Sequence, residues 1–145
     1  MKKEFEEYLE KIGITELFFD KAVEVLDFYE KTCSIEITDI FVSDYVDHDG
    51  ERKYESMWLF SPEKIMEAKN FLNEDNFDAA TTKNNIIRWE LKKTEYDFLK
   101  TTRDSRMSLV YYQKNMLEGS LKASQDNCAA LYKIFLKYIL SNMCE

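Results

Sequence analysis

The sequence predicts an α+β protein built on a bent antiparallel sheet of about five to six strands. Several strand-like segments follow one another with short turns between them, which favours antiparallel pairing over helical crossovers. Segments of helical periodicity lie at both ends of the chain. With 145 residues and 45% hydrophobic residues, the chain is expected to form a single α+β domain over residues 1–145.

Residues 1–32 are expected to form an N-terminal helical hairpin. Apolar residues recur at helical spacing in two stretches, and Gly13 between them is typical of a residue that ends a helix. The two stripes are Phe5, Tyr8, Leu9 and Ile12, then Phe18, Ala22, Val25, Leu26 and Tyr29.

Residues 35–60 predict a β-hairpin, followed by a helix over residues 61–72. The hairpin turn is assigned to Asp47–Gly50, because Asp-Gly tolerates the positive φ that such turns need. Both predicted strands carry apolar side chains on both faces, so both faces should be covered. Ser61 and Pro62 resemble an N-cap and a first helical residue, and apolar residues follow at helical spacing.

Residues 86–123 predict further antiparallel strands, with a connecting loop over residues 101–105. In residues 86–93 the apolar side chains alternate with charged ones, as in a strand with one buried and one solvated face. Residues 79–85 fit either a short edge strand or a loop. Residues 124–143 predict a C-terminal amphipathic helix that is capped by Ser124 and packs on the sheet.

Charge and composition exclude several classes of function. The net charge of −8 disfavours general binding of nucleic acids and anionic membranes. No apolar run is long enough to span a bilayer, and the N-terminus does not resemble a secretory signal, so the protein is expected in the cytoplasm. Three cysteines without Cys-x-x-Cys spacing indicate reduced thiols. No metal site and no cofactor is expected.

The charge is unevenly distributed along the chain. Residues 1–82 carry 9 Lys or Arg against 21 Asp or Glu, whereas residues 83–114 carry 8 against 4. This asymmetry would allow two copies to pair as a homodimer, or the basic segment to hold an anionic ligand. The default expectation is that the two segments neutralise each other within one fold.

Two groups of residues are candidates for binding. The first is a basic and aromatic group in the strands of residues 86–112, suited to a phosphate or carboxylate ligand: Arg88, Trp89, Lys92, Arg106 and Tyr112. The second is an acidic group at the hairpin tip, suited to a partner protein: Asp44, Asp47, Asp49 and Glu51. Such an acidic turn could in principle bind calcium. The residues around it do not match the ligand positions of a calcium-binding EF-hand loop, so a solvated turn is expected there.

No motif commits the chain to a reaction, and no catalytic residue is assigned. We interpret the sequence as a non-enzymatic intracellular interaction domain that presents an acidic surface to a more basic partner protein. An immunity protein or a secretion chaperone would fit this description. The alternative is an α+β domain that binds a small molecule through an aromatic pocket and an Arg/Lys anchor, with or without catalytic activity.

Overall fold

The computed structural model describes residues 1–72, 78–83, 85–94, 105–114 and 116–143. The chain divides into two compact units. The first unit comprises Met1–Val42 and Glu55–Thr82, and the second comprises Ser43–Tyr54 and Lys83–Glu145.

Two helices open the first unit. Helix α1 spans Lys3–Lys11, and α2 spans Glu16–Asp27 and continues into a π-helical turn, η1, over Phe28–Thr32. Gly13 ends α1 as predicted: its φ of 88° is left-handed, and the N–H of Ile14 reaches back to the carbonyl of Leu9 at 2.9 Å. The buried residues of both helices include Leu9, Val25 and Tyr29.

Strands β1 (Asp39–Val46), β2 (Arg52–Phe60), β3 (Lys64–Lys69) and β4 (Asp78–Lys83) form a sheet in that order. Residues 43–46 of β1 and 52–54 of β2 belong to the second unit. Four consecutive residues of β2, Met57–Phe60, are buried, which confirms that both faces of this segment are covered. Strand β4 lies at the sheet edge, so the edge-strand alternative for this segment is confirmed.

The predicted helix over residues 61–72 is wrong, because Lys64–Lys69 is strand β3. Its residues pair antiparallel with β2, from Met57 opposite Ala68 to Phe60 opposite Ile65. Ser61 is not a helix N-cap. Its hydroxyl accepts the N–H of Lys64 at 3.0 Å and so forms the turn between the two strands. Pairing with the fully buried part of β2 outweighs the helical spacing of this short segment.

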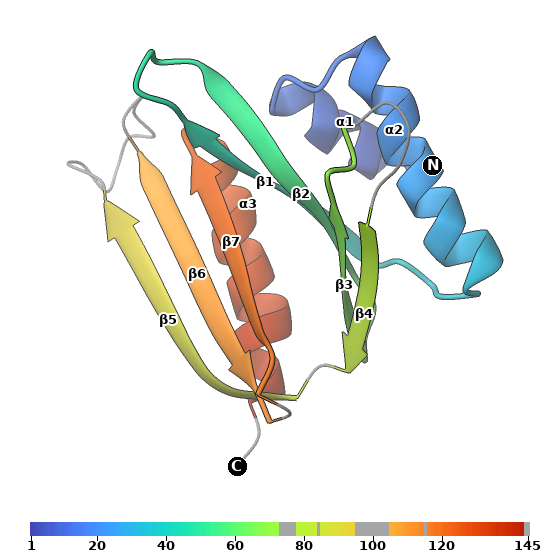
Figure 1. Cartoon of the computed structure of the whole chain (residues 1–145), viewed down its shortest axis with the longest axis vertical. Coiled ribbons are helices and arrows are strands. Elements are labelled where there is room, and N and C mark those ends of the chain that lie inside the picture. The colour runs from blue at the N-terminus through green and yellow to red at the C-terminus, as the bar shows by residue number, and fades with distance from the viewer. Residues whose placement is uncertain (73–77, 84, 95–104, 115, 144–145) are drawn as a thin grey trace. The chain divides into compact units, whose positions relative to one another are not determined.

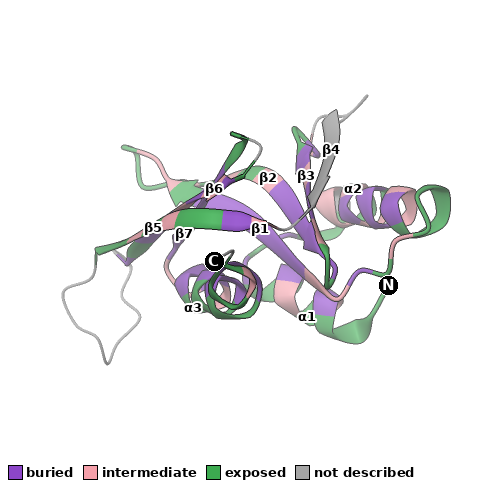
Figure 2. Cartoon of the chain, turned by 90° about the horizontal axis from the view of Figure 1, so that it is seen from below, coloured by how far each residue is buried: buried purple, intermediate pink, exposed green. Residues whose placement is uncertain are grey.

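The second unit contains a three-stranded antiparallel sheet covered by a helix. Strands β5 (Ile86–Thr94), β6 (Arg106–Gln113) and β7 (Glu118–Ser124) are ordered β5-β6-β7. Helix α3 spans Asn127–Ile134 and continues as η2 (Phe135–Ile139) and η3 (Leu140–Asn142). Figures 1 and 2 show α3 lying along one face of this sheet.

The C-terminal helix therefore begins three residues later than the sequence predicts. Ser124 is the last residue of β7 rather than a helix cap, and its hydroxyl donates to the carboxylate of Asp44. The cause is the long-range contact, because a serine that is buried against a carboxylate no longer serves the helix N-terminus.

The predicted α+β class and antiparallel pairing are confirmed. The single bent sheet of five to six strands is not confirmed, since the described strands form two sheets of four and three strands. The single-domain assignment stays a prediction. The predicted loop over residues 101–105 lies outside the described residues except for Ser105.

Gly119 of β7 lies directly opposite Tyr111 of β6, and a Cβ added at Gly119 would overlap the ring of Tyr111. That ring is 3% exposed, so it has little room to move. We expect Gly119→Ala to lower the free energy of unfolding by about 1–3 kcal/mol, as overpacked cores do. Urea denaturation would measure the loss.

The exposed neighbour Ser120 provides the matched control, and Ser120→Ala should change stability by less than about 0.5 kcal/mol. Equal stabilities of Gly119→Ala and wild type would show that Tyr111 does not cover this glycine.

Candidate functional site

The β5-β6-β7 sheet carries a polar face opposite helix α3. Residues that pair directly across strands lie on the same face. One row consists of Lys92, Ser108 and Lys122, and the next consists of Thr94, Arg106 and Ser124. The other face carries buried apolar residues such as Leu109 and Leu121. Two rows of hydroxyl and cationic side chains therefore lie side by side.

These rows line a half-open pocket of about 330 Å³ within the second unit. This volume is at the lower end of the range of about 300–1,000 Å³ that is typical of small-molecule sites. Its lining residues come from β1, β5, β6 and β7: Asp44, Tyr45, Val46, Lys92, Thr94, Arg106, Met107, Ser108, Lys122, Ala123 and Ser124. Three of them are cationic and one is a carboxylate.

The end of β1 meets the edge of β7 through side chains. The Oγ of Ser43 accepts the N–H of Lys122 at 2.8 Å and donates to the carbonyl of the same residue at 3.2 Å. The N–H of Ser124 donates to the Asp44 carboxylate at 3.0 Å. These bonds satisfy backbone groups that an edge strand would otherwise leave open, and they fix the wall of the pocket that β1 supplies.

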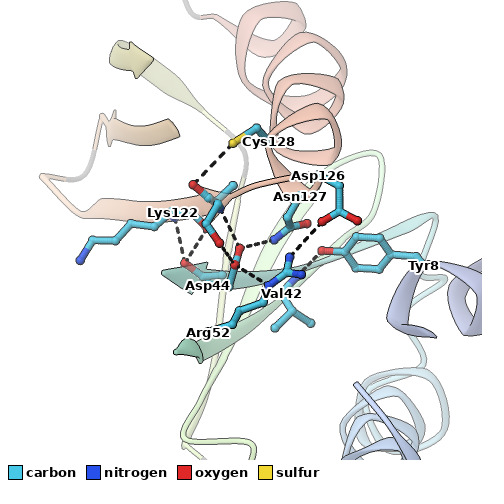
Figure 3. Close-up of polar contacts among 11 residues, drawn as sticks. Tyr8, Val42, Asp44, Arg52, Lys122, Asp126, Asn127 and Cys128 are labelled. Carbon is cyan, nitrogen blue, oxygen red and sulfur yellow. Dashed lines mark hydrogen bonds and ion pairs between the residues drawn. The ribbon is translucent and has the colours of Figure 1, made fainter. Parts of the chain in front are cut away.

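Asp44 is the centre of a buried polar cluster (Figure 3). It is fully buried, and its carboxylate accepts four hydrogen bonds. Besides the N–H of Ser124, the donors are the hydroxyl of the same serine, the Nδ2 of Asn127 at 2.6 Å and the Nε of Arg52 at 2.8 Å. A buried charge is tolerated when it is paired and hydrogen-bonded in this way.

Arg52 links this cluster to a second carboxylate. Its Nη2 donates to Asp126 at 3.3 Å, and its side chain is 18% exposed. Burial alone would lower the pKa of the Arg52 guanidinium, but the charge of Asp44 and the hydrogen bond to it raise the pKa overall. For the Tyr54 phenol, which is neutral when protonated, burial instead raises the pKa, and the positive charge of Arg52 partly opposes this rise. Arg52 therefore stays protonated and neutralises Asp44.

The predicted ligand-binding residues separate into three groups. Lys92 and Arg106 line the pocket. Arg88 lies on the same face, but its guanidinium stacks on the ring of Tyr112 at 4.1 Å, outside the pocket lining. Trp89 points to the opposite face, where its ring meets Phe135 of η2 edge-on at 4.6 Å. Arg88, Lys92 and Arg106 lie on one face of the sheet. Whether any of these residues binds a ligand stays a prediction.

Fewer acidic side chains are exposed at the hairpin tip than the sequence predicts. Asp44 is buried, so it does not contribute to an exposed acidic surface. Asp47 uses its carboxylate to accept the N–H groups of Asp49 and Glu51, both at 2.9 Å, and so shapes the turn. The side chains of Asp49 and Glu51 are 73% and 69% exposed, and Glu51 pairs with Lys53 at 3.0 Å.

Eight of the eleven lining residues were not predicted as site residues, and four of them bear on the proposed chemistry: Tyr45, Thr94, Ser108 and Lys122. The alternation of residues 117–123 puts Lys122 on the polar face, and a register assigned through the turn before β7 would have placed it opposite Ser108. No such signal exists for Tyr45. Its strand reaches the pocket through the Asp44 cluster, in which Ser124 and Asn127 are 80 and 83 positions from Asp44.

No protein-family model matches this sequence, and neither the curated proteins nor the solved structures contain a significant match to it. The site is therefore interpreted from its own residues.

Two features are absent from the described residues. Among them, no three His, Cys, Asp or Glu side chains gather in a group that could hold a metal ion. Within the same part of the chain, no helix has the length and apolarity needed to cross a membrane. Cys33 is exposed, Cys128 is buried with its thiol donating to the carbonyl of Ala123, and Cys144 lies outside the described residues.

Replacing Asp44 should strongly destabilise the protein. Asp44→Ala would remove the acceptor of the Arg52 Nε and Asn127 Nδ2 hydrogen bonds, and the loss of one partner from a buried ion pair costs about 3–5 kcal/mol. Chemical denaturation monitored by circular dichroism would measure this change.

Asp49→Ala is the matched control, because it removes an exposed carboxylate from the same hairpin. It should alter stability by less than about 0.5 kcal/mol. A stable Asp44→Ala protein would contradict the structural role of the cluster.

Proposed function

We propose that this protein is a binding domain whose pocket on the polar face of the β5-β6-β7 sheet holds the phosphate or carboxylate group of a small ligand. The observation that carries the proposal is the arrangement of three cationic side chains, Lys92, Arg106 and Lys122, around Ser108. This is the small-molecule alternative of the sequence analysis, with a different set of lining residues.

The register supports a site of the right size for one anionic group. Lys92 and Lys122 flank Ser108 on the two neighbouring strands, and strands lie about 4.8 Å apart. The two lysine backbones are thus roughly 10 Å apart, and their long side chains can converge above the serine. Arg106 is two residues from Ser108 on the same face and can offer a two-pronged donor to a phosphate or carboxylate.

The balance of charge in the pocket also supports an anionic ligand. Asp44 is the carboxylate in the lining, and Arg52 already neutralises it at 2.8 Å. Among the described residues, no carboxylate forms a salt bridge with Lys92 or Arg106. Glu90 lies on the same face as Lys92 but one row away and outside the lining. With Asp44 neutralised, the lining carries a net positive charge, which favours an anion in the pocket.

We expect Arg106→Ala to weaken the binding of inorganic phosphate by about tenfold or more, since hydrogen bonds to charged groups contribute about 1.5–3 kcal/mol. Lys92→Ala and Lys122→Ala should each weaken it as well, and added salt should weaken binding to the wild type. Isothermal titration calorimetry would measure the dissociation constants.

Lys133→Ala is the matched control, because Lys133 is an exposed cation on α3, which covers the opposite face of the sheet. It should leave the affinity unchanged. Equal losses from Lys133→Ala and Arg106→Ala would indicate unspecific attraction of the anion rather than a site.

The acidic hairpin tip supports a second candidate function, recognition of a more basic partner protein. The two N–H bonds to Asp47 hold the turn in one shape, and the carboxylates of Asp49 and Glu51 remain largely exposed on it. Exposed charge of one sign speeds association with an oppositely charged partner.

For this candidate we expect a basic partner to co-purify with the native protein and to bind more weakly at high salt. Native mass spectrometry would identify it, and the Asp49→Lys, Glu51→Lys double variant should lose it while keeping its stability. Retention of the partner by the double variant would exclude the tip as its binding surface.

A further inference from the structure

We infer that the ligand of this pocket carries a planar ring next to its anionic group, and that the ring stacks on Tyr45. This inference rests on the function proposed above and specifies the class of ligand. The shared chemistry is an aromatic anion, either a phosphate attached to a nucleoside or a carboxylate attached to an aromatic ring.

The size of the pocket is the first argument. One anionic group between Lys92, Lys122 and Arg106 would occupy only part of the 330 Å³, which is a volume typical of whole small molecules. The body of the ligand must therefore extend beyond the cations along the lining. The side of the pocket that β1 supplies consists of Asp44, Tyr45 and Val46.

The position of Tyr45 is the second argument. It is a large ring that lines the pocket, yet it is 41% exposed. The Nζ of Lys122 lies 5.9 Å from the ring centroid, close to the outer limit of about 6 Å for a cation–π contact. The ring and one of the three cations are thus neighbours. A ligand held through its anion at Lys122 would bring an attached planar group over this ring, where stacking is favourable.

The anchoring of β1 is the third argument. Tyr45 directly follows Asp44, and Asp44 is held by donors from β7 and from α3. Ser43 on the other side of Asp44 is bonded twice to Lys122. The backbone that carries Tyr45 is therefore fixed against the strand that carries Lys122. Because the two backbones are held together, less freedom is lost when the ring and the cation engage a ligand, which lowers the cost of binding.

The test compares ligands with and without a ring. Calorimetry on the full chain would measure adenosine monophosphate against ribose 5-phosphate, and benzoate against acetate. In at least one of these pairs, the dissociation constant of the aromatic ligand should be at least about tenfold lower than that of its partner without an aromatic ring. The pair that shows the difference identifies the anionic group as phosphate or carboxylate.

Two variants assign the difference to Tyr45. Tyr45→Ala should remove the preference for the aromatic member, while Tyr45→Phe should retain it, because the stacking face is kept. Arg106→Ala should weaken both members of the pair alike.

The outcomes separate this inference from the function on which it rests. Binding of ribose 5-phosphate as tight as that of adenosine monophosphate, together with equal binding of benzoate and acetate, would overturn the role of Tyr45 and leave the anion site standing. A preference that survives Tyr45→Ala would overturn it too. No binding of any of the four probes by the folded protein would overturn both.

Discussion

The second unit depends on one buried carboxylate. Asp44 is fully buried and takes hydrogen bonds from a backbone amide, a hydroxyl, a side-chain amide and a guanidinium. These donors come from β7, from the start of α3 and from the returning strand of its own hairpin. An unpaired carboxylate could not remain in this position, because its desolvation would cost more than the surrounding packing returns. The carboxylate therefore ties β7, the start of α3 and the returning strand of its hairpin together.

The pocket is a consequence of this cluster. Because the side chains of Ser43 and Asp44 bond to the backbone of β7, the end of β1 lies against the edge of the three-stranded sheet. Tyr45 and Val46 follow and become one wall, and the polar rows of β5, β6 and β7 supply the rest. Arg52 neutralises the negative charge of Asp44. The pocket as a whole is therefore cationic, although the net charge of the protein is −8.

Features that depend on residues close together in the chain could be predicted from the sequence. Alternation along residues 86–93 is enough to place Lys92 on the polar face, and the Asp-Gly turn and the stop at Gly13 follow from backbone preferences of single residues. Residues 64–69 show the limit. Their apolar positions fit both periods, and only pairing with the buried end of β2 selects the strand.

The candidate site was predictable only in part, for a related reason. Asp44 is three positions from Asp47, so the sequence groups it with the exposed acids of the tip. Its true partners, Ser124 and Asn127, lie far along the chain. Lys92 and Arg106 could be identified because the residue pattern within their own strands predicts those strands. Tyr45 lies in the pocket because of contacts between residues far apart in the chain, which such a pattern does not show.

The most direct test of this account is an NMR titration of the isotopically labelled protein with inorganic phosphate, following each backbone amide. The account predicts saturable shifts concentrated at Lys92, Arg106, Ser108 and Lys122, and their reversal by added salt. Shifts centred elsewhere in a folded protein, or no saturable shift at all, would contradict the central claim that these strands hold an anion-binding pocket.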